Sequence, residues 1–207
     1  MFEKLVKMNC YSKNRMIKFI AKNLLEKFYC CEINCIEIDK SILFAHHARG
    51  CTIIAAKICE NVVIFQNVTI GTNMRFNKIS NEWENIGNPI ICKNVVIADG
   101  AKIFGPIIIG ENTVVAAGSI ITKDIPANSI AFGINQFKPK GNNYDLLFNS
   151  NMINPEKLIE ANKKLIAIFK ENNNKTGKSP LEDIPRVKLN ITTQEIVEIL
   201  QECRAGL

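Results

Sequence analysis

Two adjacent histidines, His46 and His47, are the residues of this sequence whose type could most readily do chemistry. They are the only two histidines among 207 residues, and they stand in the segment LFAHHARG shortly before Gly50. An imidazole titrates near neutral pH, so it can take the proton of a hydroxyl group that attacks an acyl carbon. The alternative is a polar patch at a turn. The elements around the pair decide between these two interpretations.

The central part of the sequence repeats every six residues. The repeat has a leading aliphatic position at Ile58, Ile64, Ile70, Ile91, Ile97, Ile103, Ile109, Val115 and Ile121. Its fifth position, small or β-branched in every hexad, holds Val62, Val68, Val95, Ala101, Ile107, Thr113, Ser119 and Ile125. A period of six does not fit a helix of 3.6 residues per turn. It predicts a solenoid of very short strands, three hexads to a coil, with an apolar column inside. Small residues follow several leading positions, where the chain turns or is closely approached: Gly71, Ala98, Gly110 and Ala116.

The register of the repeat breaks once, between Ile70 and Ile91. Residues 72–88 therefore leave the coil as an external loop that carries Arg75 and the only tryptophan, Trp83. Long ordered excursions from a compact fold are often functional. We expect Trp83 and Arg75 to line a substrate site or to anchor the loop to a neighbouring subunit.

The segments on either side of the repeat differ from it in character. We predict an N-terminal helical segment over residues 1–35, the coils over 36–139 and a helical C-terminal extension over 140–207. In the extension, Asn154 and Pro155 are typical of a helix start, and Thr192 with Glu195 is typical of a capping box. No catalytic motif stands in the extension, so packing, oligomerisation or partner contact is its expected role.

The formal charge of +6 is concentrated at the N-terminus. Residues 1–30 carry seven basic side chains and two acidic ones, a net charge of +5. Ile17, Ile20 and Leu24 recur there at helical spacing, which indicates a basic amphipathic helix. Such a helix can contact a membrane surface or nucleic acid. Scattered lysines are more typical of a solvated face on a packed helix, and no aromatic-rich motif favours nucleic acid.

Composition narrows the class further. No run of eighteen apolar residues and no signal peptide is present, so a cytoplasmic protein is expected. The eight cysteines are then expected to be reduced. A zinc site built from Cys30, Cys31, Cys35 and a histidine lacks the usual ligand spacing, and no metal is expected.

Three segments carry a resemblance to a known family. They are HHARGCTIIAAKICENVVIFQNVTIGTN, IICKNVVIADGAKIFGPIIIGENTVVAAGSIITKDIPANS and the closing AFGIN. Residues 36–139 resemble the hexapeptide-repeat O-acetyltransferases, close to the serine acetyltransferase group. The resemblance implies a mainly β fold, a left-handed parallel β-helix, in a homotrimer with active sites between neighbouring prisms. It also implies acetyl-CoA as co-substrate, lying along the coil edges.

The resemblance implies a catalytic histidine and a carboxylate that orients it. Counting back by hexads selects His46 as the base, whereas the family's His-x-x-Gly selects His47. We prefer His46, because the stacked core fixes the register while a turn can shift its glycine. Neighbours in an extended chain point to opposite faces, so at most one imidazole is expected to face the substrate. Glu32 is the better positional match for the carboxylate, with a slip of one residue, and Asp39 is nearer in sequence.

The resemblance also implies where acetyl-CoA and the acceptor bind. Acetyl-CoA would contact the small residues Gly100, Ala117 and Gly118, and Lys123 would meet a CoA phosphate. Serine acetyltransferases carry an arginine-histidine pair before a proline at the end of the loop. Here Asn88 stands in the place of that histidine.

These departures bear on the acceptor. The missing arginine-histidine pair favours a neutral acceptor, so we predict direct acetyl transfer to a sugar hydroxyl of a surface polysaccharide or its precursor. The alternative is a serine O-acetyltransferase of cysteine biosynthesis. A third interpretation is a scaffold without catalytic activity.

Overall fold

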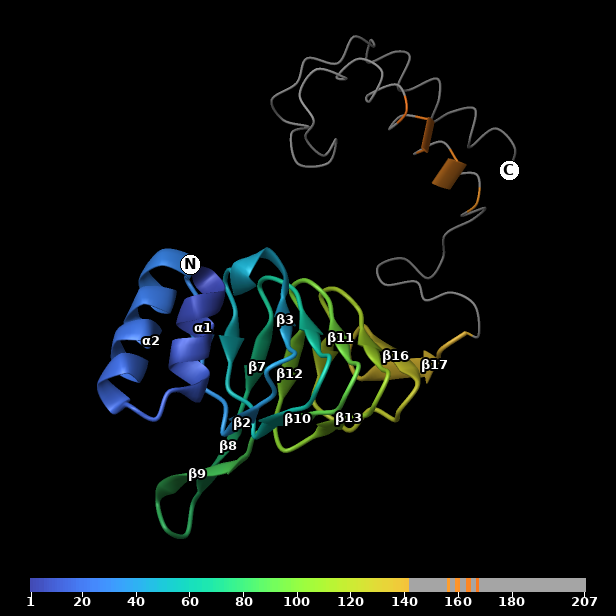
Figure 1. Ribbon diagram of the computed structural model, residues 1–207. Coiled ribbons are helices and arrows are strands. Elements are labelled where there is room, and N and C mark those ends of the chain that lie inside the picture. The colour runs from blue at the N-terminus through green and yellow to red at the C-terminus, as the bar shows by residue number, and fades with distance from the viewer. Residues whose placement is uncertain (142–155, 157–158, 161–162, 165–166, 168–207) are drawn as a thin grey trace, which may run out of the picture. The chain divides into compact units, whose positions relative to one another are not determined.

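The computed structural model describes residues 1–141 together with residues 156, 159–160, 163–164 and 167 (Figure 1). Contacts group the chain into two units, Met1–Phe148 and Asn149–Leu207. The predicted helical extension lies largely outside the described residues, including Asn154, Pro155, Thr192 and Glu195. Its six described positions have helical backbone, and the extension as a whole stays a prediction.

Very short strands make three sheets in which all but one pairing is parallel. The first sheet contains, in order, β1 (Glu32–Ile33), β4 (Thr52–Ile53), β7 (Thr69–Gly71), β12 (Lys102–Phe104) and β15 (Ile120–Ile121). The second contains β2 (Glu37–Ile38), β5 (Lys57–Ile58), β10 (Ile90–Ile91) and β13 (Ile108–Ile109). The third contains β3 (Leu43–Phe44), β6 (Val63–Ile64), β11 (Val96–Ile97), β14 (Val114–Val115), β16 (Ser129–Phe132) and the antiparallel β17 (Gln136–Pro139).

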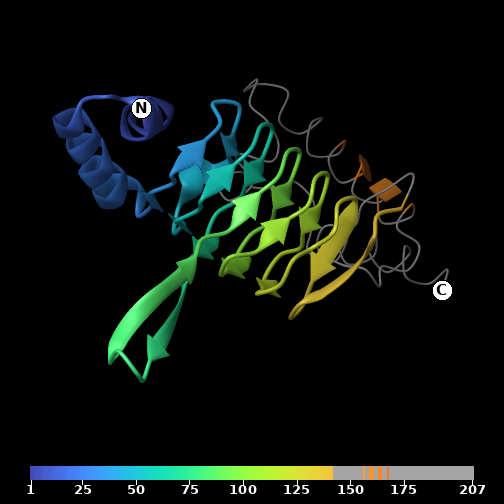
Figure 2. The ribbon, with the colours of Figure 1, turned by 90° about the horizontal axis from the view of Figure 1, so that it is seen from below.

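Consecutive strands visit the three sheets in turn, so three strands make one coil of a stack (Figures 1 and 2). We name the turns by the sheets they join: corner 1–2, corner 2–3 and corner 3–1. In the second sheet, for example, Ile91 pairs with Ile58 on one side and with Ile109 on the other. The period of six predicted three hexads to a coil, and this prediction is confirmed.

The predicted apolar column is the core of the stack. Every leading residue of the repeat from Ile58 to Ile121 is at most 1% exposed, and every fifth residue is buried as well. Burying a side chain of this size contributes about 1.5–3 kcal/mol. β-Branched residues pack well on such short, pleated segments, which explains why isoleucine and valine dominate the column.

An asparagine ladder runs along corner 2–3. Asn61, Asn94, Asn112 and Asn128 all have left-handed backbone, with φ between 55° and 57°. Asparagine tolerates this conformation better than most residues. The side-chain amide of each donates to the side-chain oxygen of the next, at N···O distances of 3.3, 2.9 and 3.1 Å. The ladder therefore ties four successive coils together at one corner.

Residues 72–88, predicted as an external loop, form a β-hairpin at corner 1–2. Its strands β8 (Asn73–Asn77) and β9 (Glu82–Gly87) pair with each other alone and project from the coils as an arm (Figure 2). Trp83 packs edge-on against Phe76 across the hairpin, with the two ring centroids 5.4 Å apart. Arg75 Nε lies 2.6 Å from Glu84 Oε2 on the other face.

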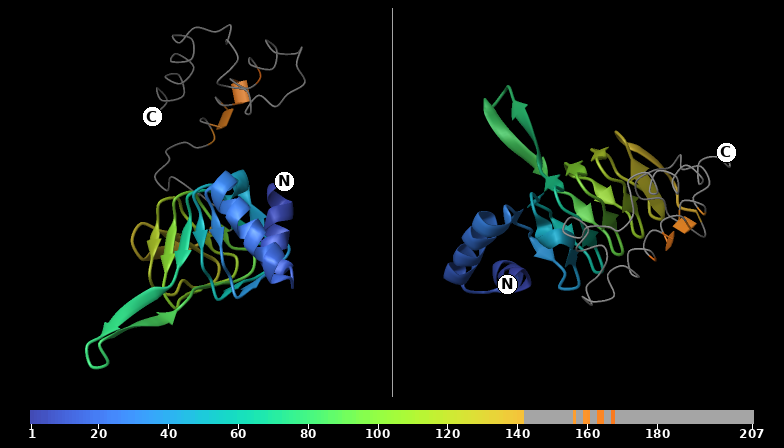
Figure 3. Two further views of the ribbon diagram at one scale, coloured as in Figure 1. Left: turned by 90° about the vertical axis from the view of Figure 1, so that its left-hand side faces the viewer. Right: turned by 90° about the horizontal axis from the view of Figure 1, so that it is seen from above.

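Two helices, α1 (Phe2–Tyr11) and α2 (Arg15–Tyr29), lie at the end of the stack where the first coil begins (Figure 3). The Asn14 side chain caps α2 by accepting from the backbone N–H groups of Met16 and Ile17. α1 buries Phe2, Leu5 and Val6, and α2 buries Ala21 and Leu25. The first coil begins at Glu32, inside the segment predicted as helical, because β1 pairs with β4.

Candidate active site

The two histidines occupy a left-handed turn, Ala45–Ala48, at corner 3–1 between β3 and β4. His46, His47 and Ala48 have φ values of 51°, 58° and 52°. The chain is therefore not extended at the histidine pair, so the premise from which we expected the two imidazoles to diverge is wrong. Left-handed backbone costs an L-residue about 1–2 kcal/mol. Such strain persists where the surroundings hold the chain, and it is often found at functional sites.

The two imidazoles contact different neighbours. The His47 ring lies 5.4 Å from the Phe2 ring and 5.7 Å from the Tyr29 ring, centroid to centroid, so it packs between the two helices. The His46 ring lies 6.2 Å from Phe65, which follows β6 in the next coil. His47 thus faces the helices, and His46 faces the stack of coils.

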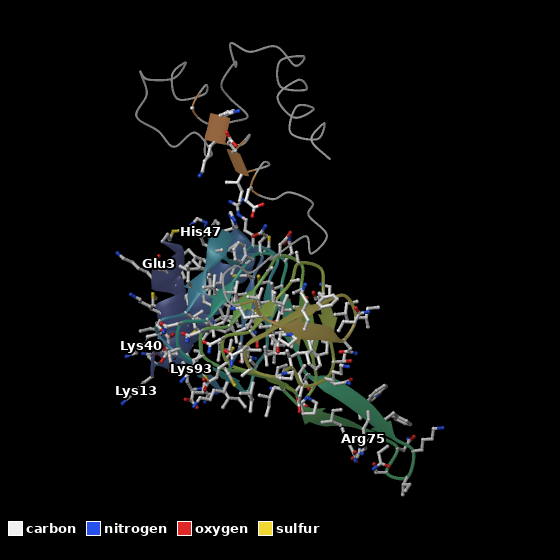
Figure 4. The ribbon with its side chains drawn as sticks, turned by 90° about the vertical axis from the view of Figure 1, so that its right-hand side faces the viewer. Glu3, Lys13, Lys40, His47, Arg75 and Lys93 are labelled. Carbon is white, nitrogen blue, oxygen red and sulfur yellow. The ribbon has the colours of Figure 1, made fainter. Side chains whose placement is uncertain are left out.

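Both imidazoles line a cavity of about 360 Å³ between α1 and the first coil. The walls are formed by Phe2, Glu3, Val6, Lys7 and Tyr11 from α1 and by Lys40, Ile42, Leu43 and Phe44 from the coil. Figure 4 shows His47, Glu3 and Lys40 along this side of the molecule. The cavity has the size of a small-molecule site, and its lining mixes apolar side chains with charged and polar ones.

Glu32 and Asp39, the two predicted orienting carboxylates, lie in different places. Glu32 begins β1 just past corner 3–1, where the N–H of Gly50 donates to the Cys30 carbonyl of the preceding coil. It therefore shares the corner of the histidines, although its Oε1 lies 3.4 Å from Lys22 Nζ. Among the described residues, no carboxylate hydrogen-bonds to either imidazole.

The structure does not bring Asp39 to the histidines. Asp39 lies at corner 2–3, and its carboxylate accepts hydrogen bonds from the hydroxyl and the backbone N–H of Ser41, at 2.6 and 2.8 Å. These bonds lower the pKa of Asp39. The Tyr11 hydroxyl donates to its backbone carbonyl at 2.7 Å. Asp39 therefore stabilises the turn before β3. Its closeness to the histidines in the sequence does not correspond to closeness in the structure.

Gly100, Ala117 and Gly118, the residues predicted along acetyl-CoA, lie on the same corner as the histidines. Gly100 and Gly118 have φ values of 70° and 67°, and their N–H groups donate to carbonyls of the preceding coil. A Cβ placed on Gly118 would meet nothing within 4 Å, and one on Gly100 would lie 3.9 Å from the Gly118 backbone. At Gly100 and Gly118 the corner therefore presents backbone that no side chain of the glycines covers.

The remaining predicted residues lie at corner 1–2. Lys123 follows β15 there, with its Nζ 5.9 Å from the centre of the Phe137 ring, so the structure does not bring it to Gly100 and Gly118. Arg75 and Trp83 lie on the arm, and Asn88 follows it, with a buried side-chain oxygen that has no hydrogen-bond partner. Figure 4 shows Arg75 on the arm, well away from His47.

Sequence reasoning missed Lys7, Tyr11, Lys40 and Phe65 around the histidines. Lys7 and Tyr11 are four residues apart and so share one face of α1. That spacing was visible in the sequence. Their place beside the first coil depends on how α1 packs, which no local pattern specifies.

No protein-family model matches the chain. A serine acetyltransferase from Buchnera aphidicola subsp. Schizaphis graminum is 44% identical over 89 residues, which are 42% of this chain and 32% of the relative. One from Bacillus pumilus is 33% identical over 94 residues, 44% of this chain and 39% of the relative. The chain resembles the serine acetyltransferases.

A solved serine acetyltransferase in complex with cysteine supports the same fold. It superposes with a TM-score of 0.50 and 24% identity, over 66% of this chain and 56% of that one. The chain spans well under half the length of the two curated relatives named above.

Within the described part of the chain, no group of three or more His, Cys, Asp or Glu side chains could hold a metal ion.

Proposed function

We propose that this chain is an acetyl-CoA-dependent O-acetyltransferase. The observation that carries the proposal is that both histidines line a cavity and lie on the same corner as Gly100 and Gly118, which present bare backbone. The co-substrate along that corner and the acceptor in the cavity would then meet at an imidazole. The likeness to serine acetyltransferases supports the same reaction class.

The chemistry follows from what an imidazole can do. A neutral ring nitrogen accepts the proton of the acceptor hydroxyl as its oxygen attacks the thioester carbon. The carbon–sulfur bond then breaks, and the imidazolium returns the proton to the departing CoA sulfur. The products are an acetyl ester and free CoA. No covalent enzyme intermediate is needed.

We assign the base to His46, because its ring faces the coils on which the co-substrate would lie, beside Phe65. His47, between Phe2 and Tyr29, would then shape the acceptor side of the cavity. We assign the orienting carboxylate to Glu32, because β1 begins next to corner 3–1, on which the histidines lie. It would have to exchange its contact with Lys22 for that role.

L-Serine is the acceptor that the relatives favour, since those described above are named serine acetyltransferases. This supports the alternative drawn from the sequence better than its first choice, a sugar hydroxyl. One observation still favours the sugar: Gly87 and Asn88 precede Pro89, where serine acetyltransferases carry an arginine and a histidine. The cavity beside His46 would have to supply another partner for a serine carboxylate, and Lys7 and Lys40 line it.

A homotrimer would complete the site. Arg75, Trp83 and Asn88 lie at or beyond corner 1–2, whereas His46 lies at corner 3–1, so one chain does not join them. Three prisms packed side by side would bring corner 1–2 of one copy to corner 3–1 of the next. The arm residues predicted to line the substrate site would then meet the histidines of a neighbour.

The test measures free CoA released from acetyl-CoA with L-serine and with a panel of sugars. The matched variants are His46→Asn and His47→Asn, because asparagine tolerates the left-handed backbone of the turn. Loss of a general base predicts a decrease in kcat of about 10²–10⁴-fold in His46→Asn. His47→Asn should retain most of kcat and change the KM of the acceptor. The reverse result would move the base to His47. Absence of acetyl-CoA binding would reject the function.

A further inference from the structure

Helix α2 turns an apolar face to the outside of the molecule. It exposes Met16 by 71%, Ile17 by 36%, Phe19 by 68%, Ile20 by 47% and Phe28 by 58%. Only Ala21 and Leu25 of this helix are buried against the rest of the chain. The helix does pack on the main domain and its cations are exposed, as expected, but exposed apolar side chains accompany them. The packing uses a narrow stripe and leaves most of the apolar side chains uncovered.

The exposed side chains lie on one half of the helix surface. Met16, Phe19 and Ile20 are three and four residues apart, so they are neighbours on the helix. Ile17 and Phe28 are eleven residues apart, about three turns, so they lie in line with each other along one edge of this surface. We call these five residues the α2 apolar face. Figures 1 and 2 show α2 as the outermost element at its end of the molecule, with α1 beside it.

Cations border the α2 apolar face. Arg15 is four residues before Phe19 and so neighbours it, and Lys27 lies seven residues beyond Ile20, in line with it. Lys13 precedes the helix and is exposed. On α2, Lys22 is the cation with acidic partners among the described residues, at 3.6 Å from Glu26 and 3.4 Å from Glu32. The surroundings are strongly basic, since residues 1–30 carry a net charge of +5.

We propose that the α2 apolar face docks on an anionic membrane surface. The apolar side chains would enter the boundary between headgroups and acyl chains, while Lys13, Arg15 and Lys27 contact the lipid phosphates. Pairing with a second copy is disfavoured, because it would bring the cations of two identical faces together. No helix in the described part of the chain is long and apolar enough to cross a bilayer. The contact is therefore peripheral.

This docking would leave the candidate active site open. The cavity beside the histidines is lined by α1 and the first coil, and no residue of α2 contributes to it. The inference is consequently independent of the proposed function. A chain that lacks acetyltransferase activity could still bind the membrane, and the reverse is equally true.

Vesicle co-sedimentation of the full chain tests the proposal. The probes are vesicles of phosphatidylcholine alone and vesicles of equal parts phosphatidylcholine and phosphatidylglycerol. The test variant is Phe19→Ser with Ile20→Ser, and the matched control is Phe76→Ser, an exposed apolar side chain on the arm. We expect binding to the anionic vesicles alone, weakened at least about tenfold in the test variant and unchanged in the control.

Three results would overturn the inference. The first is a wild-type chain that does not bind the anionic vesicles. The second is binding that the Phe19→Ser, Ile20→Ser variant retains in full, since the apolar face would then play no part. The third is concentration-dependent self-association in sedimentation velocity, without vesicle binding, that the same variant abolishes. That result would assign the face to a second copy. Unchanged circular dichroism of the variant establishes that it folds.

Discussion

Replacing Gly110 by alanine should destabilise the stack of coils, although other hexads of the repeat carry alanine at the equivalent position. Gly110 follows the leading residue Ile109, and alanine occupies the equivalent position at Ala98 and Ala116. The structure separates these cases. A Cβ on Gly110 would lie 2.7 Å from Ala127 Cα and from the Pro126 carbonyl carbon, and closer still to Ala127 N.

The size of the effect follows from what blocks the new methyl group. Ordinary contacts begin at 3.4 Å, so the backbone of the next coil must shift by about 0.7 Å or more. That backbone is held, because Gly110 N donates to Ile125 O at 2.9 Å and Ile125 bridges to Ile109. Overpacking costs about 1–3 kcal/mol, and a fixed backbone places this case near the upper end. At about 2–4 °C per kcal/mol, Tm should fall by about 6–12 °C.

Gly71→Ala is the matched control for urea unfolding followed by far-ultraviolet circular dichroism. Gly71 also follows a leading residue, Ile70, but a Cβ there would meet the Phe104 ring at an ordinary 3.5 Å. This variant should be unchanged or about 0.4–1 kcal/mol more stable, since alanine restricts the unfolded chain. Equal unfolding midpoints for Gly110→Ala and Gly71→Ala would refute the steric reasoning.

Two further predictions concern titrating groups. Hydrogen bonds from Asn77 and Arg75 lower the pKa of Glu84 on the arm. These hydrogen bonds therefore contribute fully to the stability of the folded protein above the ordinary glutamate pKa. Their contribution is lost as the pH falls through the lowered pKa of Glu84. In Arg75→Gln the pKa of Glu84 should move up toward its ordinary value, as a carboxyl-carbon NMR titration would show; an unmoved pKa would contradict the assignment. Burial raises the pKa of the Cys35 thiol to about 11, so at mildly alkaline pH iodoacetamide should label it far more slowly than the exposed Cys30. Mass spectrometry of the digested protein measures both rates, and equal labelling would show that Cys35 is accessible.

The core could be predicted from the sequence because one simple period governs it. Ile97 and Ile103 are buried for the same reason, and a count by sixes finds both. The same count predicts that Gly100 and Gly118, on the edge proposed for CoA, share a corner. They are eighteen residues apart, which is one full coil. Lys123 does not fit that spacing. Its position at another corner was therefore already contained in the repeat.

The histidine turn could not be predicted in this way. Within this left-handed turn Ala48 is fully buried, and His47 packs against Phe2 of α1. The contact of His47 with Phe2 joins residues far apart in the sequence. Likewise, the break of the six-residue repeat at residues 72–88 indicated a segment that leaves the coils. That this segment forms a hairpin depends on cross-strand pairs, such as Phe76 with Trp83, and the repeat does not predict these pairs.

β17, the last strand in the described part of the chain, has a consequence for how the stack of coils ends. A stack of parallel strands ends in an open edge, and such an edge can template the coil of another molecule, leading to end-to-end fibres. On the third sheet β17 covers this edge and runs against the direction of the coils, pairing Lys138 with Ile130 and Pro139 with Ser129. A proline cannot donate to a further strand, and a lysine disfavours a dry contact. On this sheet, β17 therefore disfavours the addition of coils from another molecule.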